Sequence, residues 1–363
     1  MRSSQILPPY GFVKMLGGFR GLLLKIHRKL FPGSVALYEQ FQSFWLLQPL
    51  YIAAKLNISD HLKNKSLTIT ELAKKTGSDP EALYRVMRAL ASLGIFKETE
   101  GMRFKLNSTS KALLEGEGCM RNMIIHHLGP VNWQAIGNLL HTVQTGENSF
   151  AGLYGMDIYP YLQKNRDELL RFEKSMSDLS ALALKPVLLR YDFSKFKTIA
   201  DIGGGEGFLL VKILEKYSGL NGVLFDLPEN SGKAGDFIRA SGMSHRISCV
   251  NGSFLDPFRI EADLYIMKNV LHNWDDEQFS RILRNLRNTM AKGAVLLILE
   301  MVVPGPETAS WSKLIDIQMM ATMHGGLERT EQEFGSLLRR SGFSLKRTIP
   351  TIAPLSILET VGE

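Results

Sequence analysis

Large apolar residues and cations are mixed along the first 38 residues of the chain, which hold no Asp or Glu. From Phe12 to Phe31 the apolar residues are interrupted by Lys14, Arg20 and Lys25, so no apolar window is long enough to span a bilayer. This pattern predicts a basic amphipathic arm over residues 1–34. We interpret the arm as a helix that docks on a partner subunit, and peripheral contact with an anionic membrane surface is the alternative.

A helix-turn-helix pattern follows the arm. The segment Ser66–Glu71 carries a capping signature that begins one helix, and Gly77–Pro80 supplies turn residues. Apolar residues stripe the helix behind the turn at helical spacing, namely Leu83, Val86, Leu90 and Leu93. A short hairpin is expected between Ile95 and Leu106. The pattern therefore predicts a winged-helix domain over residues 35–118.

A winged helix has two common uses, and the surrounding charges distinguish them. In a DNA-binding domain, Tyr84, Arg85 and Arg88 would face a major groove. Phosphate contacts require a surplus of positive charge, whereas acidic residues offset the cations here, namely Glu71, Asp79, Glu81, Glu98 and Glu100. We therefore favour a dimerisation surface, and we expect a homodimer that binds no nucleic acid.

The pattern over residues 119–194 predicts a helical connector that is rich in aromatic residues and methionine. Most of these side chains are expected to lie in the core. An aromatic and thioether lining also suits a flat apolar substrate, so the connector is expected to contribute to a substrate pocket.

Strand and helix patterns alternate over residues 195–363, which predicts an α/β domain with a mostly parallel, Rossmann-like sheet. Strands are expected at residues 197–202, 221–226, 247–251, 263–270 and 294–300. Parallel sheets bind ligands at the carboxyl ends of their strands. The residues that follow these strands are therefore the candidates for a functional site.

Composition limits the class of protein further. The chain of 363 residues is 45% hydrophobic, which is enough for a buried core and more than one domain. Its net charge of +7 is concentrated in the arm, because 37 basic and 36 acidic residues remain after the first 38 residues. The near-neutral body argues against a large phosphate-binding face. Cys119 and Cys249 are too few for a disulfide framework and lack zinc-ligand spacing, so we expect a cytoplasmic protein.

The first expected strand runs into the glycine-rich turn Asp201–Gly207, and an apolar helix follows directly. Glycines at this position let a ligand approach the backbone. The spacing of nicotinamide-binding turns is absent, because counting from Gly203 and Gly205 places the third glycine position at Phe208. The turn instead has the spacing Asp-x-Gly-x-Gly-x-Gly.

The next two strand ends carry further candidates for a nucleoside site. Asp226 ends the second strand and can accept hydrogen bonds from ribose hydroxyls, although capping of the next helix is the alternative. The third strand leads to Ser253 and Phe254, where backbone and an aromatic ring can bracket an adenine.

A candidate general base follows the fourth strand. A neutral imidazole at His272 can remove a proton from a hydroxyl group that attacks an electrophile. Glu300 follows the fifth strand and Glu328 lies in the loop 325–330. Two acids beside one base would hold its tautomer and stabilise the imidazolium. A structural histidine with two surface carboxylates is the alternative.

These motifs resemble, in this order, the two-domain small-molecule O-methyltransferases, which include plant caffeate and flavonoid enzymes, hydroxyindole O-methyltransferase and bacterial polyketide-tailoring enzymes. The resemblance covers roughly residues 35 to 360. It rests on Asp201–Gly207, Phe225–Pro228, Met267–Lys268, His272–Trp274, Glu300 and Gly325–Thr330. It implies S-adenosylmethionine as the cofactor and no metal. The implied reaction is methyl transfer to a phenolic or enolic hydroxyl of a small aromatic or polyketide-like metabolite.

The resemblance also implies a role for each matched position. The catalytic residues would be His272, Glu300 and Glu328. The cofactor contacts would be Asp201, Gly203, Gly205, Asp226, Leu227, Ser253, Phe254 and Lys268. The substrate contacts would be Trp133, Phe172, Met176, Met319, Met320 and Met323.

Two positions depart from the family pattern. Many relatives have an acidic residue at the position of Ser253, so a hydroxyl replaces an acidic adenine contact here. Asn273 replaces the Asp of the usual His-Asp-Trp sequence. Relatives on the same scaffold methylate carbon or nitrogen, or catalyse decarboxylation or hydroxylation, and a winged-helix regulator with a degenerate cofactor domain is a further alternative. The presence of His272, Glu300 and Glu328 favours O-methylation.

Overall fold

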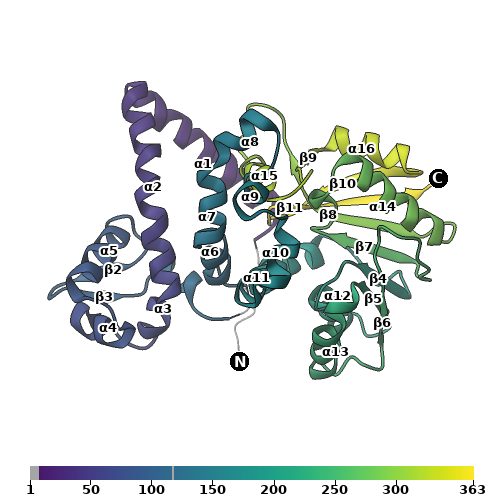
Figure 1. Cartoon of the computed structure of the whole chain (residues 1–363), viewed down its shortest axis with the longest axis horizontal. Coiled ribbons are helices and arrows are strands. Elements are labelled where there is room, and N and C mark those ends of the chain that lie inside the picture. The colour runs from purple at the N-terminus through teal and green to yellow at the C-terminus, as the bar shows by residue number, and fades with distance from the viewer. Residues whose placement is uncertain (1–7, 117) are drawn as a thin grey trace. The chain divides into compact units, whose positions relative to one another are not determined.

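The computed structural model describes residues 8–116 and 118–363, which form two compact units (Figure 1). Unit 1 comprises the described residues up to Trp133 together with Arg166–Leu179. Unit 2 comprises Gln134–Asn165 and Ser180–Glu363. The residues of the expected connector, 119–194, are therefore divided between the two units.

Unit 1 is mainly helical and includes a small three-stranded sheet. Its elements are α1 (Tyr10–Leu30), α2 (Gly33–Lys55), α3 (Ile58–His61), β1 (Leu67–Thr68), α4 (Ile69–Thr76), α5 (Pro80–Ser92), β2 (Lys97–Thr99), β3 (Arg103–Lys105), η1 (Ser110–Leu113) and α6 (Arg121–His127). Helices α7 (Pro130–Gly137) and α11 (Arg166–Arg190) each begin in unit 1 and end in unit 2.

Helices α4 and α5 and the hairpin β2–β3 form the predicted winged helix. Thr68 and Glu71 make a reciprocal capping box at the start of α4, and Asp79 caps α5 by accepting the Ala82 N–H at 2.8 Å. The three strands are antiparallel in the order β1-β3-β2. The largest buried side chains include Leu72, Met87, Leu90, Phe96 and Phe104. Burial of this apolar set holds the two helices and the hairpin together.

Unit 2 is built on an eight-stranded sheet with the main order β10-β11-β8-β7-β4-β5-β6, and β9 pairs with β8. The strands are β4 (Thr198–Ile202), β5 (Asn221–Asp226), β6 (Ile247–Asn251), β7 (Leu264–Lys268), β8 (Val295–Val303), β9 (Arg329–Thr330), β10 (Phe343–Pro350) and β11 (Leu355–Gly362). Strands β4 to β9 pair in parallel, and only β10 and β11 join antiparallel. The prediction of a mostly parallel, Rossmann-like sheet is confirmed.

Helices cover both faces of this sheet. The helices of unit 2 include α8 (Leu139–Thr145), α9 (Ser149–Tyr154), α10 (Ile158–Lys164), α12 (Phe208–Lys216), α13 (Ser231–Ala240), α14 (Asp276–Thr289), α15 (Trp311–Thr322) and α16 (Glu331–Arg340), with 3-10 turns η2 (Pro228–Asn230) and η3 (Leu271–Asn273). Side chains alternate along each strand. Ile199 and Ile266 therefore pack with α12 and α13, whereas Ala200 and Met267 pack with α14 and α16.

A search of the described helices finds none that combines the length and the apolar character needed to cross a bilayer.

Candidate active site

The predicted cofactor residues follow the ends of four adjacent strands. Strands β7, β4, β5 and β6 are neighbours in this order and run parallel. Their carboxyl ends therefore lie along one edge of the sheet. The segments at this edge are Gly203–Gly205, Asp226–Leu227, Ser253–Phe254 and Lys268.

The glycine turn after β4 is closed on one side and open on the other. Gly203 and Gly205 both have positive φ, 75° and 59°, which favours glycine. A Cβ at Gly203 would lie 2.9 Å from Val270 Cγ2, and a Cβ at Gly204 would lie 2.6 Å from Asp201 Oδ2. A Cβ at Gly205 would meet no described atom within 4 Å. The backbone at Gly205 is thus accessible to a ligand.

Asp201 supplies an unpaired acceptor beneath this turn. The residue is 2% exposed, and its Oδ2 has no hydrogen-bond partner among the described residues. Burial raises the pKa of Asp201 to about 7, and the positive charge of Lys268 opposes the shift. Burial in turn lowers the pKa of Lys268, against the charges of Asp201 and Glu300. A buried, unpaired carboxyl oxygen suits a ligand with an ammonium group.

Asp226 is held by three donors. Its Oδ2 accepts the Gly205 N–H, and its Oδ1 accepts the Leu227 N–H and the Asn230 side-chain amide, each at 2.7 Å. Neither the turn η2 nor the helix α13 has a side-chain cap, so the helix-capping alternative for Asp226 is wrong. A carboxylate has about four acceptor positions. One position therefore remains for a ribose hydroxyl in this arrangement.

Tyr159 lies within electrostatic range of Asp226, and sequence reasoning did not select it. Desolvation by the surrounding protein and the charge of Asp226 both raise the pKa of Tyr159, to about 12. The residue belongs to α10, far from Asp226 in the sequence. Nothing in the local pattern distinguishes it from the neighbouring tyrosines, so no sequence signal could have identified it.

Ser253 and Phe254 link the cofactor edge to the segment of the candidate base. The Ser253 hydroxyl accepts the Leu255 N–H at 3.2 Å. The Phe254 ring would lie 3.4 Å from a Cβ at Gly203, and it meets the Trp274 ring edge to face at 5.9 Å between centroids. Phe254 therefore packs between the glycine turn and the residues that follow β7.

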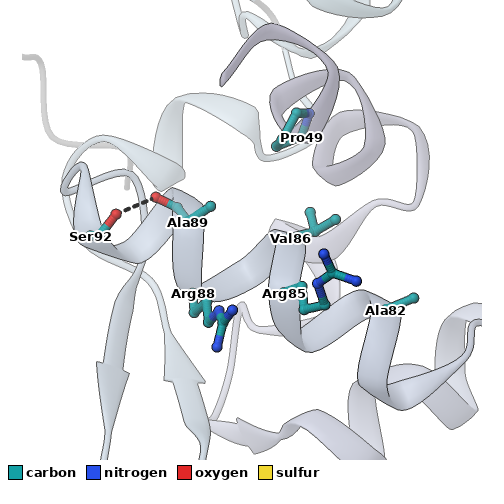
Figure 2. A pocket seen from close by; sticks show the side chains of 7 residues that line it. All are labelled: Pro49, Ala82, Arg85, Val86, Arg88, Ala89 and Ser92. Atoms are coloured by element: carbon teal, nitrogen blue, oxygen red, sulfur yellow. Dashed lines mark hydrogen bonds between the residues drawn. The ribbon is translucent and has the colours of Figure 1, made fainter. Parts of the chain in front are cut away.

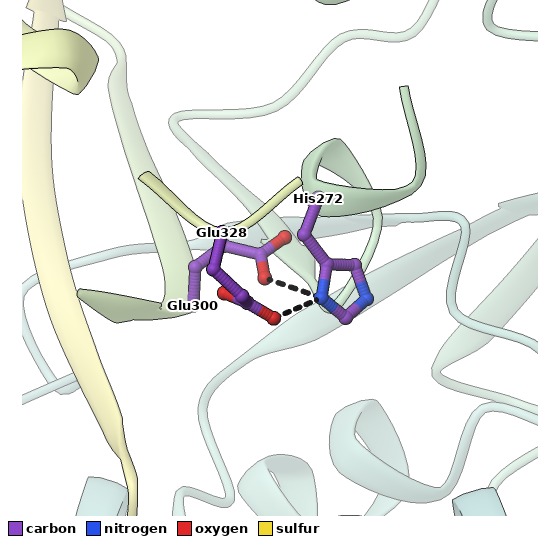
Figure 3. Close-up of side chains that lie close together, drawn as sticks. All are labelled: His272, Glu300 and Glu328. Atoms are coloured by element: carbon purple, nitrogen blue, oxygen red, sulfur yellow. Dashed lines mark hydrogen bonds and ion pairs between the residues drawn. The ribbon is translucent and has the colours of Figure 1, made fainter. Parts of the chain in front are cut away.

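His272, Glu300 and Glu328 converge at one point, as Figure 3 shows. Nδ1 of His272 lies 2.8 Å from Glu328 Oε1 and 3.7 Å from Glu300 Oε2. Both carboxylate side chains are 0% exposed, and the His272 side chain is 16% exposed. Nε2 points away from both carboxylates (Figure 3). The arrangement leaves Nε2 available to another group.

The strand and turn that carry these acids fix their positions. Glu300 lies inside β8 and not at its end, because β11 pairs with β8 as far as Met301 and β9 pairs with Val302 and Val303. The expected strand end at Glu300 is therefore wrong. Glu300 Oε1 accepts the N–H groups of Val270 and Leu271 at 2.9 and 3.0 Å, which orients its other oxygen toward the imidazole.

Burial lowers the pKa of His272, but the charge of Glu300 and the hydrogen bond and charge of Glu328 outweigh it. The net shift is upward from the ordinary value of 6.5. Burial raises the pKa of Glu300, against the charge of His272. One ligand atom from each of the three residues lies within 4.8 Å of the others, a spacing that is also compatible with a metal ion. In this structure Nδ1 of His272 and Oε1 of Glu328 contact each other directly.

The loop after α15 holds the segment around His272 in place. Leu327 donates its N–H to the His272 carbonyl at 2.8 Å. The guanidinium of Arg329 is 1% exposed and donates to the carbonyls of Leu271 and Trp274 and to the Asp276 carboxylate. It also lies over the Phe279 ring at 4.7 Å. Sequence reasoning included Arg329 in a motif but gave it no function, and this geometry makes it a positioning residue.

The predicted substrate residues fall in both units. In unit 2, a Cβ at Gly326 would lie 3.3 Å from Met319 Cε, 2.5 Å from Met323 Cβ and 3.3 Å from the His272 carbonyl. Met319, Met323 and the His272 carbonyl therefore all lie around Gly326. Met320 is half-buried on α15.

The other three substrate candidates belong to unit 1. The Trp133 ring lies 5.7 Å from Phe44, and the Phe172 ring lies 5.5 Å from His126. Met176 is half-buried on α11. Met319 and Met323 thus lie next to the segment of His272, whereas Trp133 and Phe172 make these ring contacts with residues of unit 1.

An open groove of about 760 Å³ lies on the winged helix (Figure 2). It is lined by Pro49, Ala82, Arg85, Val86, Arg88, Ala89 and Ser92. Arg88 lies over the Tyr84 ring at 5.7 Å, and a hydrogen bond with Glu98 raises the pKa of Tyr84. None of the predicted catalytic or cofactor residues lines this groove.

The fold and the site define a class of protein. It has a Rossmann-like domain with a glycine-rich turn and two carboxylates at the carboxyl edge of its sheet, a histidine–carboxylate cluster, and a winged helix that precedes this domain. Comparison with known proteins makes the class specific. The family model of the O-methyltransferase domain matches residues 136–344, and that of the O-methyltransferase dimerisation domain matches residues 38–116. The chain belongs to the O-methyltransferase family, and it is an S-adenosylmethionine-dependent methyltransferase.

Individual relatives cover nearly the whole chain. Phenazine O-methyltransferase PhzM of Lysobacter antibioticus is 38% identical over 90% of this chain and 96% of its own length. 8-Amino-8-demethylriboflavin N,N-dimethyltransferase of Streptomyces davaonensis is 31% identical over 86% of this chain and 91% of its own length. A solved methyltransferase of calicheamicin biosynthesis, in its S-adenosylhomocysteine-bound form, is 30% identical with a TM-score of 0.81, covering 91% of this chain and 98% of that one.

Proposed function

We propose that the enzyme transfers a methyl group to a phenolic or enolic hydroxyl of a small aromatic or polyketide-like metabolite, with His272 as the general base. The observation that carries this proposal is the contact of His272 Nδ1 with Glu328 at 2.8 Å. A histidine that donates from Nδ1 keeps Nε2 as a free acceptor. Nε2 is therefore the atom that would remove the hydroxyl proton.

The two carboxylates support this proton transfer in different ways. Glu328 holds the ring orientation and the tautomer, and Glu300 adds a negative charge 3.7 Å from Nδ1. Both charges stabilise the imidazolium that forms when Nε2 accepts the proton. Bound S-adenosylmethionine would supply a sulfonium-activated methyl group to the deprotonating oxygen. The proton of the hydroxyl would end on Nε2 and pass to water after the product leaves.

The residues of the strand edge would hold the cofactor. Asp201 Oδ2 would accept the ammonium group, the backbone of the turn Gly203–Gly205 would receive the amino-acid portion on its open side at Gly205, and Asp226 would bind a ribose hydroxyl. Leu227, Ser253, Phe254 and Lys268 complete the proposed set. The unpaired oxygen of Asp201 and the open space at Gly205 support this assignment.

Met319, Met320 and Met323 are proposed to contact the substrate, and this is supported by the position of Met319 and Met323 around Gly326, which lies next to the His272 carbonyl. Thioether side chains suit a flat aromatic ring. Trp133, Phe172 and Met176 are proposed to contribute as well, by the family resemblance. A homodimer formed through the winged-helix domain is part of the same proposal, and it is supported by the match to the dimerisation domain.

Methylation of an aromatic amine is the second candidate function. It is favoured by the relative from Streptomyces davaonensis, whose name states an N,N-dimethyltransferase. An amine can attack before it loses its proton, so this reaction depends less on a strong base. The buried acid pair on His272 therefore favours the hydroxyl.

The test combines cofactor binding with substrate choice. S-adenosylmethionine and S-adenosylhomocysteine are titrated by calorimetry into the wild type, His272→Ala and the exposed-histidine control His245→Ala. Methyl transfer is then measured over phenols and the corresponding aromatic amines. Cofactor binding by all three proteins, with loss of phenol methylation only in His272→Ala, supports the proposal. Amine methylation that survives in His272→Ala would replace it with the second candidate.

A further inference from the structure

Helix α1 is exposed, and the methyl-transfer chemistry does not explain its position in the fold. It runs from Tyr10 to Leu30 and has no buried residue. The matched family regions begin at residue 38, after α1 has ended. The helix therefore lies outside the parts of the chain that define the family.

The apolar side chains of α1 form one continuous arc. At about 100° of turn per residue, eight of them fall within an arc of about 120°. These are Phe12, Met15, Leu16, Phe19, Leu22, Leu23, Ile26 and Leu30, each between 47% and 71% exposed. Only Val13 and Leu24 among the large aliphatic residues of the helix lie on the other side. Such an arc requires a covering surface, because water would otherwise solvate it.

The charged residues on the remainder of the helix surface are all basic. Lys14, Arg20, Lys25, Arg28 and Lys29 lie outside the arc. The other positions there include Gly11, Gly17, Gly18 and Gly21, where a Cβ would meet no described atom within 4 Å. No Asp or Glu occurs on the helix. The helix thus has one apolar face, and the charges on its other face are all positive.

The positive charge of α1 favours one kind of covering surface for the apolar arc. A second copy of α1 would bring five further cations and no carboxylate, and the carboxylate of Glu39 on α2 already pairs with His27 of its own chain at 3.4 Å. Lysine is depleted in protein interfaces, and three of the five cations of α1 are lysines. The aromatic side chains at the start of α2, such as Phe41 and Phe44, lie in the matched dimerisation domain and can serve subunit contact without α1. An anionic lipid surface accepts both the apolar arc and the cations.

We propose that α1 lies in the plane of an anionic membrane surface, with the arc from Phe12 to Leu30 inserted between headgroups and the cations directed to lipid phosphates. The helix is about 32 Å long at about 1.5 Å per residue, so all eight apolar side chains enter one leaflet. This placement reverses the preference that the sequence alone suggested for the arm, because the structure shows a single helix with its cations segregated from its apolar face.

The test is co-flotation of the full-length protein with two kinds of vesicle, phosphatidylcholine alone and phosphatidylcholine with phosphatidylglycerol. The expected result is binding to the anionic vesicles only, with loss of binding at high salt. Phe19→Asp places a charge in the arc and is expected to lower binding at least about tenfold. Leu189→Asp, at a 63% exposed position on α11, is the matched control and is expected to bind like the wild type.

A charge-matched pair tests the cationic face. Lys25→Glu with Arg28→Glu is expected to abolish preference for anionic vesicles, whereas Lys97→Glu with Lys105→Glu changes the net charge equally on the exposed β2–β3 hairpin and is expected to keep it. Binding of S-adenosylhomocysteine by every variant shows that the fold is retained.

Three outcomes would overturn the proposal. The first is wild-type protein that does not float with anionic vesicles, and the second is Phe19→Asp that floats as well as the wild type. The third is conversion of a dimer to a monomer by Phe19→Asp in sedimentation without vesicles, which assigns α1 to a subunit interface. A stable dimer that loses only vesicle binding supports the membrane role.

Discussion

Glu328 Oε1 lies 2.8 Å from Nδ1 of His272, and this contact separates the two nitrogens of the imidazole into a bound and a free one. The backbone N–H of Glu328 is itself donated to Asp316 Oδ1 at 2.8 Å, so Glu328 is held at its backbone as well as at Oε1. The proposed base is therefore positioned through Nδ1 by a chain of contacts that runs from His272 through Glu328 to Asp316.

Glu328→Gln should lower kcat with little effect on cofactor affinity. The amide keeps the volume and an acceptor for Nδ1 but removes the charge that stabilises the imidazolium. The expected loss in kcat is on the order of 10²-fold. Steady-state kinetics with a phenolic substrate and calorimetry with S-adenosylhomocysteine measure the two quantities. The exposed residue Glu307 provides the control Glu307→Gln, and equal loss in both variants would contradict the assigned role.

The pH profile should report the raised pKa of His272. The base is active when neutral, so the rate rises as pH increases through a pKa above the ordinary value of 6.5. Glu300→Gln removes a charge that raises this pKa, so its acid limb should move to lower pH while the plateau falls. The measurement is kcat/KM against pH for both proteins. An acid limb that stays in place would show that Glu300 does not act on His272.

Chelator should leave the activity unchanged. His272, Glu300 and Glu328 could present three ligand atoms to a cation, but the proposed mechanism requires Nδ1 bound to Glu328. The experiment is methyl transfer before and after dialysis against EDTA, with metal content measured on the same samples. Activity that is lost and then restored by a divalent cation would convert this cluster into a metal centre.

Arg329 should contribute to both stability and rate without touching the cofactor. Its guanidinium is buried and donates to the Leu271 and Trp274 carbonyls on either side of His272. Arg329→Met removes the side-chain donor of the Trp274 carbonyl, and a buried group left unpaired costs about 1–3 kcal/mol. The Leu271 carbonyl keeps the Trp274 N–H at 3.3 Å. The free energy of unfolding should fall by about 1–3 kcal/mol in urea, and kcat should fall while S-adenosylhomocysteine affinity is retained. Arg340→Met, at an exposed arginine of α16, is the control and should behave like the wild type.

The parts of the fold that follow from local pattern were predictable, and those that depend on distant pairing were not. The order of strands and glycine turn located Gly203, Asp226 and His272 because parallel strands end at one edge. The approach of Tyr159 to Asp226 depends on where α10 packs, and no residue spacing encodes it. Two of the bonds of Arg329 end on backbone carbonyls, which every residue has, so the sequence carries no sign of their direction.

Gly203→Ala should weaken cofactor binding more than it weakens the fold. The new Cβ would lie 2.9 Å from Val270 Cγ2 and 3.4 Å from Phe254 Cε1, at a backbone φ of 75° that a side chain disfavours. The strain of such a conformation is about 1–3 kcal/mol. The turn relieves it by moving toward its open side at Gly205, which is the side that the ligand needs. The dissociation constant of S-adenosylhomocysteine should rise by at least about tenfold, and Gly232→Ala, where a Cβ meets no described atom within 4 Å, should leave it unchanged. Equal affinity of Gly203→Ala and wild type would show that the cofactor does not approach this turn.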